Sequence, residues 1–203
     1  MKKIFSIMLA LVMLLSFAAC NKEQEPSTPL ETVKIDGDML KADWQSGKIV
    51  FPNGNSVELP CKVSEFIEKG EFKIGNESVL GDKMLKPREM VTLNIVGNGV
   101  SFKVTARNTT STPEMSYKDA SVIEYNFNNT NEGNRQIKFA GTLTPGATRD
   151  AVEDALGRPK GQKKDDTLYY YTGKNSKDRN VKLIVSFNSD DIVNSVAYEI
   201  VYN

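Results

Sequence analysis

The chain of 203 residues is predicted to be an α+β protein made of two tandem β-α-β-β-β repeats, in which antiparallel sheets carry a short helix on one face. Three observations support this prediction. Strand-length segments alternate apolar with polar residues, clusters of Asn and Gly separate them, and each half has one short amphipathic segment. Neither half is long enough for a large core of its own, so we expect the halves to pack side by side.

The N-terminal segment has the features of a signal peptide over residues 1–19. Basic Lys2 and Lys3 precede an apolar run over residues 4–17, and the small residues Ala18 and Ala19 follow. The apolar run is shorter than the roughly 18–20 residues that a membrane-spanning helix needs. A cleaved signal is therefore favoured over a membrane span.

Cys20 is the predicted lipidation site. The sequence Phe17-Ala18-Ala19-Cys20 resembles the bacterial lipobox, although Phe17 stands where Leu is usual. In that pattern the thiol receives a diacylglycerol, and acyl chains such as palmitate anchor the mature lipoprotein to the outer face of the cell membrane. The alternative is ordinary signal cleavage with Cys20 incidental. Residues 20–32 are polar and contain two prolines, which predicts a disordered tether.

Composition excludes several classes of function. The chain has 26 basic and 26 acidic residues, and removal of Lys2 and Lys3 leaves a net charge of about −2, so no nucleic-acid partner is expected. Histidine is absent, which excludes Ser-His-Asp and Cys-His catalysis and the common zinc sites. With Cys20 lipidated, Cys61 has no intramolecular partner, and its apolar surroundings favour a structural thiol over a nucleophile.

The first repeat is assigned to residues 33–128. Residues 48–51 and 56–59 flank Asn53-Gly54, which favours a tight hairpin turn. A short helix is expected next, with Ser64 as its N-cap and Gly70 at its end. The alternation over residues 91–96 and 100–106 predicts a second hairpin, and residues 122–127 a further strand. The turn-forming run over residues 128–134 marks the boundary.

The second repeat, residues 129–203, shows the same order of elements. Residues 137–139 are expected to form a strand, and Thr148 is expected to cap a helix that Gly157 and Pro159 terminate. Val152, Ala155 and Leu156 form its apolar side. Three strands follow, over residues 168–172, 181–187 and 192–201, with residues 188–191 as a hairpin loop.

The C-terminal part resembles a known family. The residues that carry the resemblance are Gly146 to Pro159, then Tyr169-Tyr170-Tyr171, then Val185-Ser186-Phe187 before Asp190-Asp191. This pattern resembles the BamE (SmpA/OmlA) lipoproteins and is similar to the repeats of the beta-lactamase inhibitory protein. The resemblance implies an antiparallel sheet with helices on one face and a second face available to a protein partner. Members of the first family act in outer-membrane protein assembly, and the inhibitor binds an enzyme through a concave sheet.

Five aromatic residues are candidates for a partner-binding surface. They are Tyr169, Tyr170, Tyr171, Tyr198 and Trp44. Tyrosine offers a large contact area with little side-chain entropy to lose. Since strand side chains alternate between faces, at least one ring of the triplet is expected in the core. For Trp44, a place in the core or at a sheet edge is the alternative.

Charged turns are less informative. Asp36-Gly37-Asp38 is an oxygen-rich segment that is compatible with calcium binding, but it lacks the remaining ligands of a calcium-binding loop, so a plain turn is expected. No metal or other cofactor is predicted for the chain. Asp165-Asp166 and Asp190-Asp191 are expected at solvated loop tips. The basic residues within 160–164 form a loop that either contacts anionic lipid or is simply solvated.

These observations together predict a membrane-anchored, non-catalytic protein-binding or scaffold module of the cell envelope, of which an inhibitor is one specific form. Its partners would be the membrane, through the lipid anchor, and an envelope or secreted protein. The alternative is a cell-envelope enzyme that depends on two carboxylates about 5–10 Å apart. Substrate capture for a transporter is a third possibility, although it ordinarily needs two larger lobes.

Overall fold

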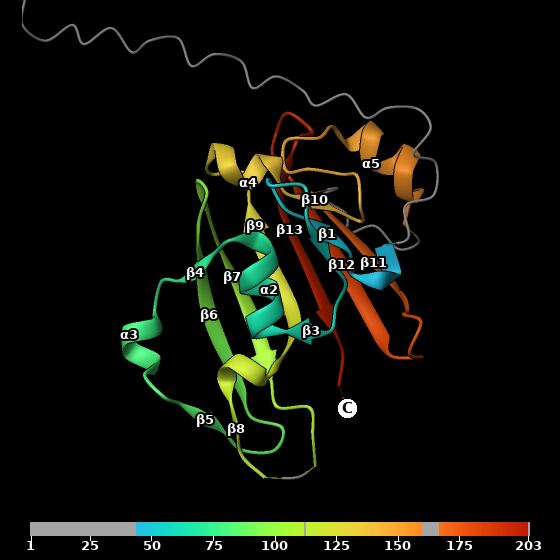
Figure 1. The fold of residues 1–203 in the computed structure, drawn as a ribbon. Helices are drawn as coiled ribbons and strands as arrows, with labels where there is room; N and C mark the ends of the chain where they lie inside the picture. The colour runs from blue at the N-terminus through green and yellow to red at the C-terminus, as the bar shows by residue number, and fades with distance from the viewer. Residues whose placement is uncertain (1–43, 112, 160–166, 203) are drawn as a thin grey trace, which may run out of the picture. The chain divides into compact units, whose positions relative to one another are not determined.

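The computed structural model describes residues 44–111, 113–159 and 167–202, all within one compact unit of the chain. The fold is α+β, as predicted, and its sheets are antiparallel (Figure 1). The helical elements are η1 (Trp44–Ser46), α2 (Val63–Gly70), α3 (Glu77–Leu80), η2 (Tyr117–Asp119), α4 (Glu132–Gln136) and α5 (Arg149–Leu156). The short strands are β1 (Ile49–Val50), β2 (Ser56–Val57), β3 (Cys61–Lys62), β4 (Lys73–Ile74), β5 (Met84–Leu85), β8 (Met115–Ser116) and β10 (Lys138–Phe139).

Six longer strands make up most of the main sheet. They are β6 (Met90–Gly97), β7 (Val100–Arg107), β9 (Ser121–Asn128), β11 (Leu168–Lys174), β12 (Asn180–Phe187) and β13 (Val193–Ile200). The strand order is β11-β12-β13-β9-β7-β6-β4, and β3 also pairs with β9. The sheet is continuous across the expected repeat boundary, because β13 pairs with β9 from Ser195–Asn128 to Glu199–Glu124.

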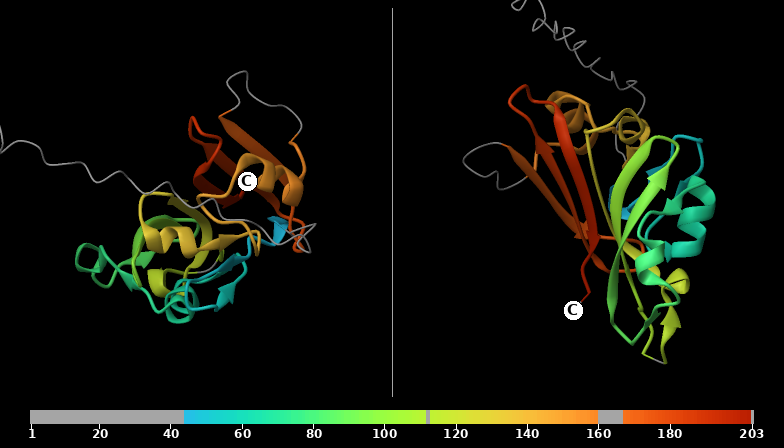
Figure 2. Two further views of the ribbon diagram at one scale, coloured as in Figure 1. Left: turned by 90° about the horizontal axis from the view of Figure 1, so that it is seen from above. Right: turned by 90° about the vertical axis from the view of Figure 1, so that its left-hand side faces the viewer.

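One face of this sheet, the core face, is buried. Its side chains include Leu93, Phe102, Tyr125, Tyr198 and Leu183, each at most 5% exposed. The alternation that was visible in the sequence therefore sends the apolar half of every long strand to the same side. The right-hand view of Figure 2 shows α2 on one side of β6 and β7.

The core face is covered by α2, α5 and a small sheet of order β10-β1-β2. Phe66 of α2 packs its ring against Phe102 of β7, with centroids 6.1 Å apart, and against Phe51 at 5.1 Å. The small sheet joins the two halves, since Ile49 of β1 pairs with Phe139 of β10. Residues predicted to start separate repeats thus share one core.

Two expected helix caps differ from the structure. Ser64 lies inside α2, whose N-cap is Lys62 without a side-chain hydrogen bond. Gly70 is the last helical residue, and the left-handed C-cap is Glu71, at φ 54°. The role of Gly70 is steric, because a Cβ there would lie 2.1 Å from the ring of Phe72. The predicted cap of α5 is confirmed, since Thr148 accepts a hydrogen bond from the Ala151 amide.

The boundary run over residues 128–134 is partly helical. Asn131 caps α4 by accepting a hydrogen bond from the Asn134 amide, at 2.7 Å. Asn134 is buried and exchanges hydrogen bonds with the backbone of Ser101 in β7, each 3.0 Å long. The segment predicted as a boundary therefore docks on the main sheet.

Several predictions lie outside the described residues. They concern the signal peptide over residues 1–19, Cys20 and the tether over 20–32, the Asp36–Asp38 turn, and the loop over 160–166. They stay predictions.

Candidate functional site

The second face of the main sheet, which we call the open face, is its candidate functional surface. Side chains on this face are exposed or partly exposed, and none of the twelve that define it is buried. These residues are Thr92, Asn94, Lys103, Thr105, Glu124, Asn126, Tyr170, Thr172, Lys182, Ile184, Ala197 and Glu199. Within the described part of the chain, helices and loops pack on the other face, so the sheet itself is accessible.

A row of neighbouring side chains crosses the open face from β11 to β6. We call it the central row, and strand pairing places its members in the order Tyr170, Ile184, Ala197, Asn126, Lys103, Asn94. Neighbouring strands lie about 4.8 Å apart, so the row is roughly 24 Å long. Its first half is apolar and aromatic, and its second half carries two amides and an ammonium.

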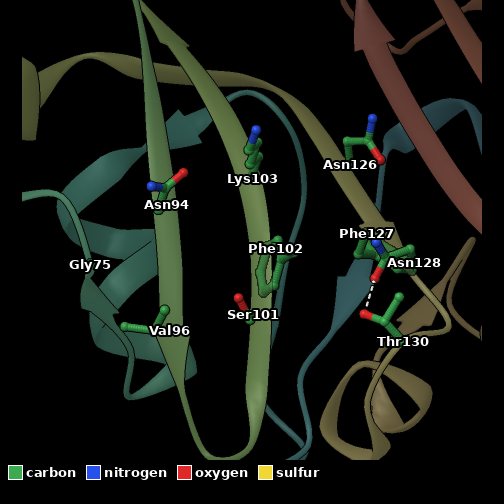
Figure 3. A pocket seen from close by; sticks show the side chains of 10 residues that line it. All are labelled: Gly75, Asn94, Val96, Ser101, Phe102, Lys103, Asn126, Phe127, Asn128 and Thr130. Carbon is green, nitrogen blue, oxygen red and sulfur yellow. Dashed lines mark hydrogen bonds between the residues drawn. The ribbon is translucent and has the colours of Figure 1, made fainter.

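The polar half of the row lines a hollow of about 640 Å³ (Figure 3). The side chains of Asn94, Lys103 and Asn126 make no hydrogen bond or ion pair with the described residues. Asn128 and Thr130 close one end, where the threonine hydroxyl donates to the asparagine oxygen at 2.5 Å. The hollow therefore presents unsatisfied donors and acceptors to whatever binds there.

The apolar half of the row is flatter. Tyr170 is 37% exposed, and it is among the few exposed large apolar side chains of the described chain. Ile184 and Ala197 beside it are partly exposed. An aromatic ring next to aliphatic side chains is the composition found at the centre of protein interfaces.

Two carboxylates face each other next to the central row. Glu124 of β9 is directly paired with Glu199 of β13. Directly opposed side chains have Cβ atoms about 4.5–5.5 Å apart, so the like charges repel. Lys182 offsets part of this repulsion, because its ammonium lies 3.7 Å from a Glu199 carboxylate oxygen.

Three of the four predicted partner-binding tyrosines lie on the core face. Tyr169, Tyr171 and Tyr198 are at most 7% exposed. The hydroxyl of Tyr171 donates to the Gly157 carbonyl at 2.9 Å, and that of Tyr198 to the Gln45 carbonyl at 2.8 Å. Burial raises the pKa of Tyr171 above its usual range, and the nearby Tyr169 raises it further. Only Tyr170 remains on the surface, because the alternation of β11 turns it away from its two neighbours.

Trp44 is partly buried against the core. Its ring lies 6.0 Å from that of Tyr171, and it also stands close to Gly173, where a Cβ would lie 3.2 Å from the indole. The structure thus places Trp44 at the edge of the core, which is the alternative considered for it.

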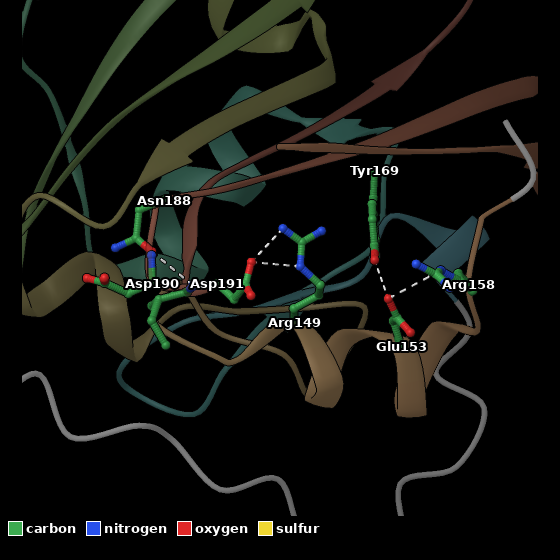
Figure 4. A network of polar contacts seen from close by, with 8 residues as sticks. Arg149, Glu153, Arg158, Tyr169, Asn188, Asp190 and Asp191 are labelled. Atoms are coloured by element: carbon green, nitrogen blue, oxygen red, sulfur yellow. Dashed lines mark hydrogen bonds and ion pairs between the residues drawn. The ribbon is translucent and has the colours of Figure 1, made fainter. Parts of the chain in front are cut away.

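A polar network holds α5 against the β12–β13 hairpin (Figure 4). Arg149 binds the Asp191 carboxylate at 2.7 Å, and its guanidinium carbon lies 4.3 Å from the centre of the Phe187 ring. Glu153 of the same helix accepts a hydrogen bond from Tyr169 and lies 3.7 Å from Arg158. Asp191, expected at a solvated loop tip, therefore has a structural partner.

Cys61 is suited to a structural role. It is the free cysteine of the described residues and is partly buried in β3, just before α2. Burial, together with Glu65, raises the pKa of its thiol to about 12, so the thiol stays protonated at neutral pH. This agrees with the prediction of a structural thiol.

The described residues contain no group of three or more potential ligands able to hold a metal ion. Among the same residues, no helix is both long and apolar enough to cross a membrane. The chain matches no protein-family model, and no curated protein or solved structure is significantly similar to it.

Proposed function

We propose that this protein is a lipid-anchored, non-catalytic binding module whose open face docks an envelope or secreted protein on the outer side of the cell membrane. The central row is the observation that carries the proposal. It combines an aromatic and aliphatic half around Tyr170 with a polar half around Lys103, all accessible among the described residues. Stable protein interfaces join an apolar centre to a polar rim in this way.

We also infer that the fold arose from two tandem repeats of the BamE-like kind. Helix α2 precedes the strands β6, β7 and β9, and helix α5 precedes β11, β12 and β13. The last strands of the two sets, β9 and β13, pair with each other. Both helices pack on the core face, α2 through Phe66 against Phe102 and α5 through its C-cap Gly157, whose carbonyl accepts from Tyr171. This arrangement leaves one uninterrupted face, the kind of surface that the inhibitor-like resemblance implies.

Photo-cross-linking in intact cells tests the binding proposal. A photoreactive amino acid at Tyr170 is expected to give a discrete cross-linked product, whereas the same residue at Val79, which is 85% exposed on α3, is expected to give none. Tyr170→Ala should weaken the complex by roughly 2 kcal/mol if the ring is an interface anchor. Equal cross-linking from both positions would contradict the proposal.

The anchor is tested separately. Cys20→Ser is expected to release the protein from membranes and to remove the acyl mass from the mature N-terminus. A free Cys20 thiol in the unmodified protein, seen by mass spectrometry, would contradict lipidation without bearing on the open face.

A carboxylate-dependent envelope enzyme is the second candidate. The directly paired Glu124 and Glu199 favour it. Their Cβ atoms are expected about 4.5–5.5 Å apart, which allows the two carboxyl groups to reach the roughly 5–5.5 Å separation of retaining glycosidases. If this reading is right, Glu124→Gln and Glu199→Gln each abolish the release of soluble fragments from purified cell-wall glycan. If the unchanged protein releases none, the candidate is excluded for this substrate.

A further inference from the structure

A second concave site lies at one end of the main sheet, away from the central row. Arg107, the last residue of β7, lines it together with Arg88 and Tyr202. The cavity measures about 170 Å³, and its wall also includes Asn108 and residues 109–111. Backbone hydrogen bonds fix the wall, because the Arg88 amide donates to the Asn108 carbonyl at 2.9 Å and the Asn108 amide donates to the Glu89 carbonyl at 3.0 Å.

Positive charge gathers around the ring of Tyr202. The guanidinium carbon of Arg107 lies 4.7 Å from the ring centroid and that of Arg179 lies 4.5 Å from it. The two cations are therefore within about 9 Å of each other and repel. Stacking on an aromatic ring holds each guanidinium in place and leaves its edge free for an anion.

The described residues supply no ion-pair partner for this charge. Within the described chain, none of Arg88, Arg107 and Arg179 forms an ion pair. The neighbouring Glu89 is engaged elsewhere, by the Lys83 ammonium at 3.1 Å and the Lys86 amide at 2.9 Å. Arg149, by contrast, has its carboxylate partner in Asp191.

A buried polar atom at this site also lacks a partner. The Arg107 Nε makes no hydrogen bond with the described residues. Burial raises the pKa of Tyr202, while Arg179 and Arg107 lower it. Buried donors without acceptors are costly, so a bound acceptor would stabilise the site.

We propose that this cavity, the arginine site, binds the phosphate group of a small molecule or of a lipid headgroup. Arg88 and Arg107 line the cavity, and Arg179 stacks on the Tyr202 ring at its wall. This concentration of positive charge favours an anion with more than one negative charge, and the forked donors of arginine match phosphate oxygens. Thr109 and Ser111 add hydroxyl groups at the wall. The volume, several times the roughly 30 Å³ of one water molecule, accommodates a tetrahedral oxyanion.

Calorimetric titration of the full chain in a neutral detergent tests the proposal, with inorganic phosphate in one arm and a short-chain phosphatidic acid in the other. We expect saturable one-to-one binding that weakens as salt is added. Arg107→Gln and Arg88→Gln should each reduce affinity about tenfold or more, as expected for a lost charge-assisted hydrogen bond. Tighter binding of the phosphatidic acid would assign the site to lipid, and equal or weaker binding to a soluble phosphate compound.

Arg158→Gln is the matched control. It removes the same charge from an exposed residue that lies next to α5 and does not line the arginine site. It should leave phosphate binding unchanged. Arg88 is exposed, so Arg88→Gln provides a variant at the site with little risk to folding. Absence of saturable binding in both arms, or binding that neither Arg107→Gln nor Arg88→Gln weakens, would overturn the proposal.

Discussion

Gly133 is the residue at which the structure predicts the largest effect from the smallest change. It lies in α4, and a Cβ added there would be 2.3 Å from the carbonyl carbon of Gly99 and 2.7 Å from the amide nitrogen of Val100. Both are backbone atoms of the β6–β7 turn, so neither can rotate away. Non-bonded heavy atoms prefer separations of about 3.5–4.0 Å. Gly133→Ala must therefore push α4 off the turn.

The loss of stability in Gly133→Ala can be worked out from the hydrogen bonds that hold α4 on β7. Asn134 makes three hydrogen bonds of 3.0 Å, two with the Ser101 backbone and one to the Asn128 carbonyl. Each is worth about 1 kcal/mol, and overpacking adds about 1–3 kcal/mol. The better helix propensity of alanine offsets about 1 kcal/mol of this loss. We expect the free energy of unfolding to fall by about 3–5 kcal/mol.

Urea unfolding followed by the fluorescence of Trp44 measures this effect, and a single shifted transition is expected. Trp44 packs on Tyr171 in the second half, so it reports whether loss of docking at α4 reaches the whole unit. Asn134→Ala should also destabilise, and the double variant should lose less than the sum of the two, because both break the same contact. An unchanged midpoint for Gly133→Ala would refute the argument.

Three further predictions concern Gly70, Cys61 and Asp191. Gly70→Ala should destabilise by about 1–3 kcal/mol in urea unfolding, and the same change in a Phe72→Ala background should be neutral or stabilising, because the ring it would strike is gone. Cys61 should react with iodoacetamide far more slowly in the folded than in the unfolded chain at pH 8. Since folding raises its pKa from 9.0 to about 12, its contribution to stability is full below pH 9 and is lost as the pH rises toward 12, a dependence that Cys61→Ser should remove. Asp191→Ala should lower the melting temperature by a few degrees, because it leaves the partly buried Arg149 without its carboxylate; equal melting temperatures would contradict that role.

Local patterns predicted the long elements of this fold well. The hairpin of β6 and β7, the strand β9 and the three strands after α5 all follow from alternation and turn residues that lie close together in the sequence. The Thr148 cap was also visible, since a cap depends on its own next three residues. The two-residue strands β3 and β4 were not, because so short a segment has no alternation to detect.

Contacts between distant segments could not be predicted in this way. The pairing of β1 with β10 joins residues about ninety positions apart, and it depends on the shape of the surrounding core. Asn134 illustrates the same limit. Its residue type indicated a turn, but its buried hydrogen bonds to Ser101 exist only after the sheet has formed.

Of the candidate surfaces, one was predicted in part from the sequence and the other was not. Alternation within Tyr169-Tyr170-Tyr171 predicted that the rings would divide between two faces, yet it could not decide which face was buried. The structure buries two of the rings and exposes Tyr170. The arginine site had no sequence signal, since Arg88, Arg107 and Arg179 lie far apart along the chain and are brought to Tyr202 only by the fold.

A β-bulge explains why Arg107 is free of the acidic residues on the open face. The register between β7 and β9 shifts after Thr105, which pairs with Glu124, so that Ala106 pairs with Val122 and Arg107 with Ser121. The additional residue, Ile123, is buried and unpaired. In a regular ladder Arg107 would stand diagonally next to Glu124, within reach of an ion pair. The bulge adds one residue of separation and turns the end of the strand, as bulges commonly do near binding sites. The same irregularity thus keeps the carboxylates of the open face and the guanidinium groups of the arginine site from neutralising each other.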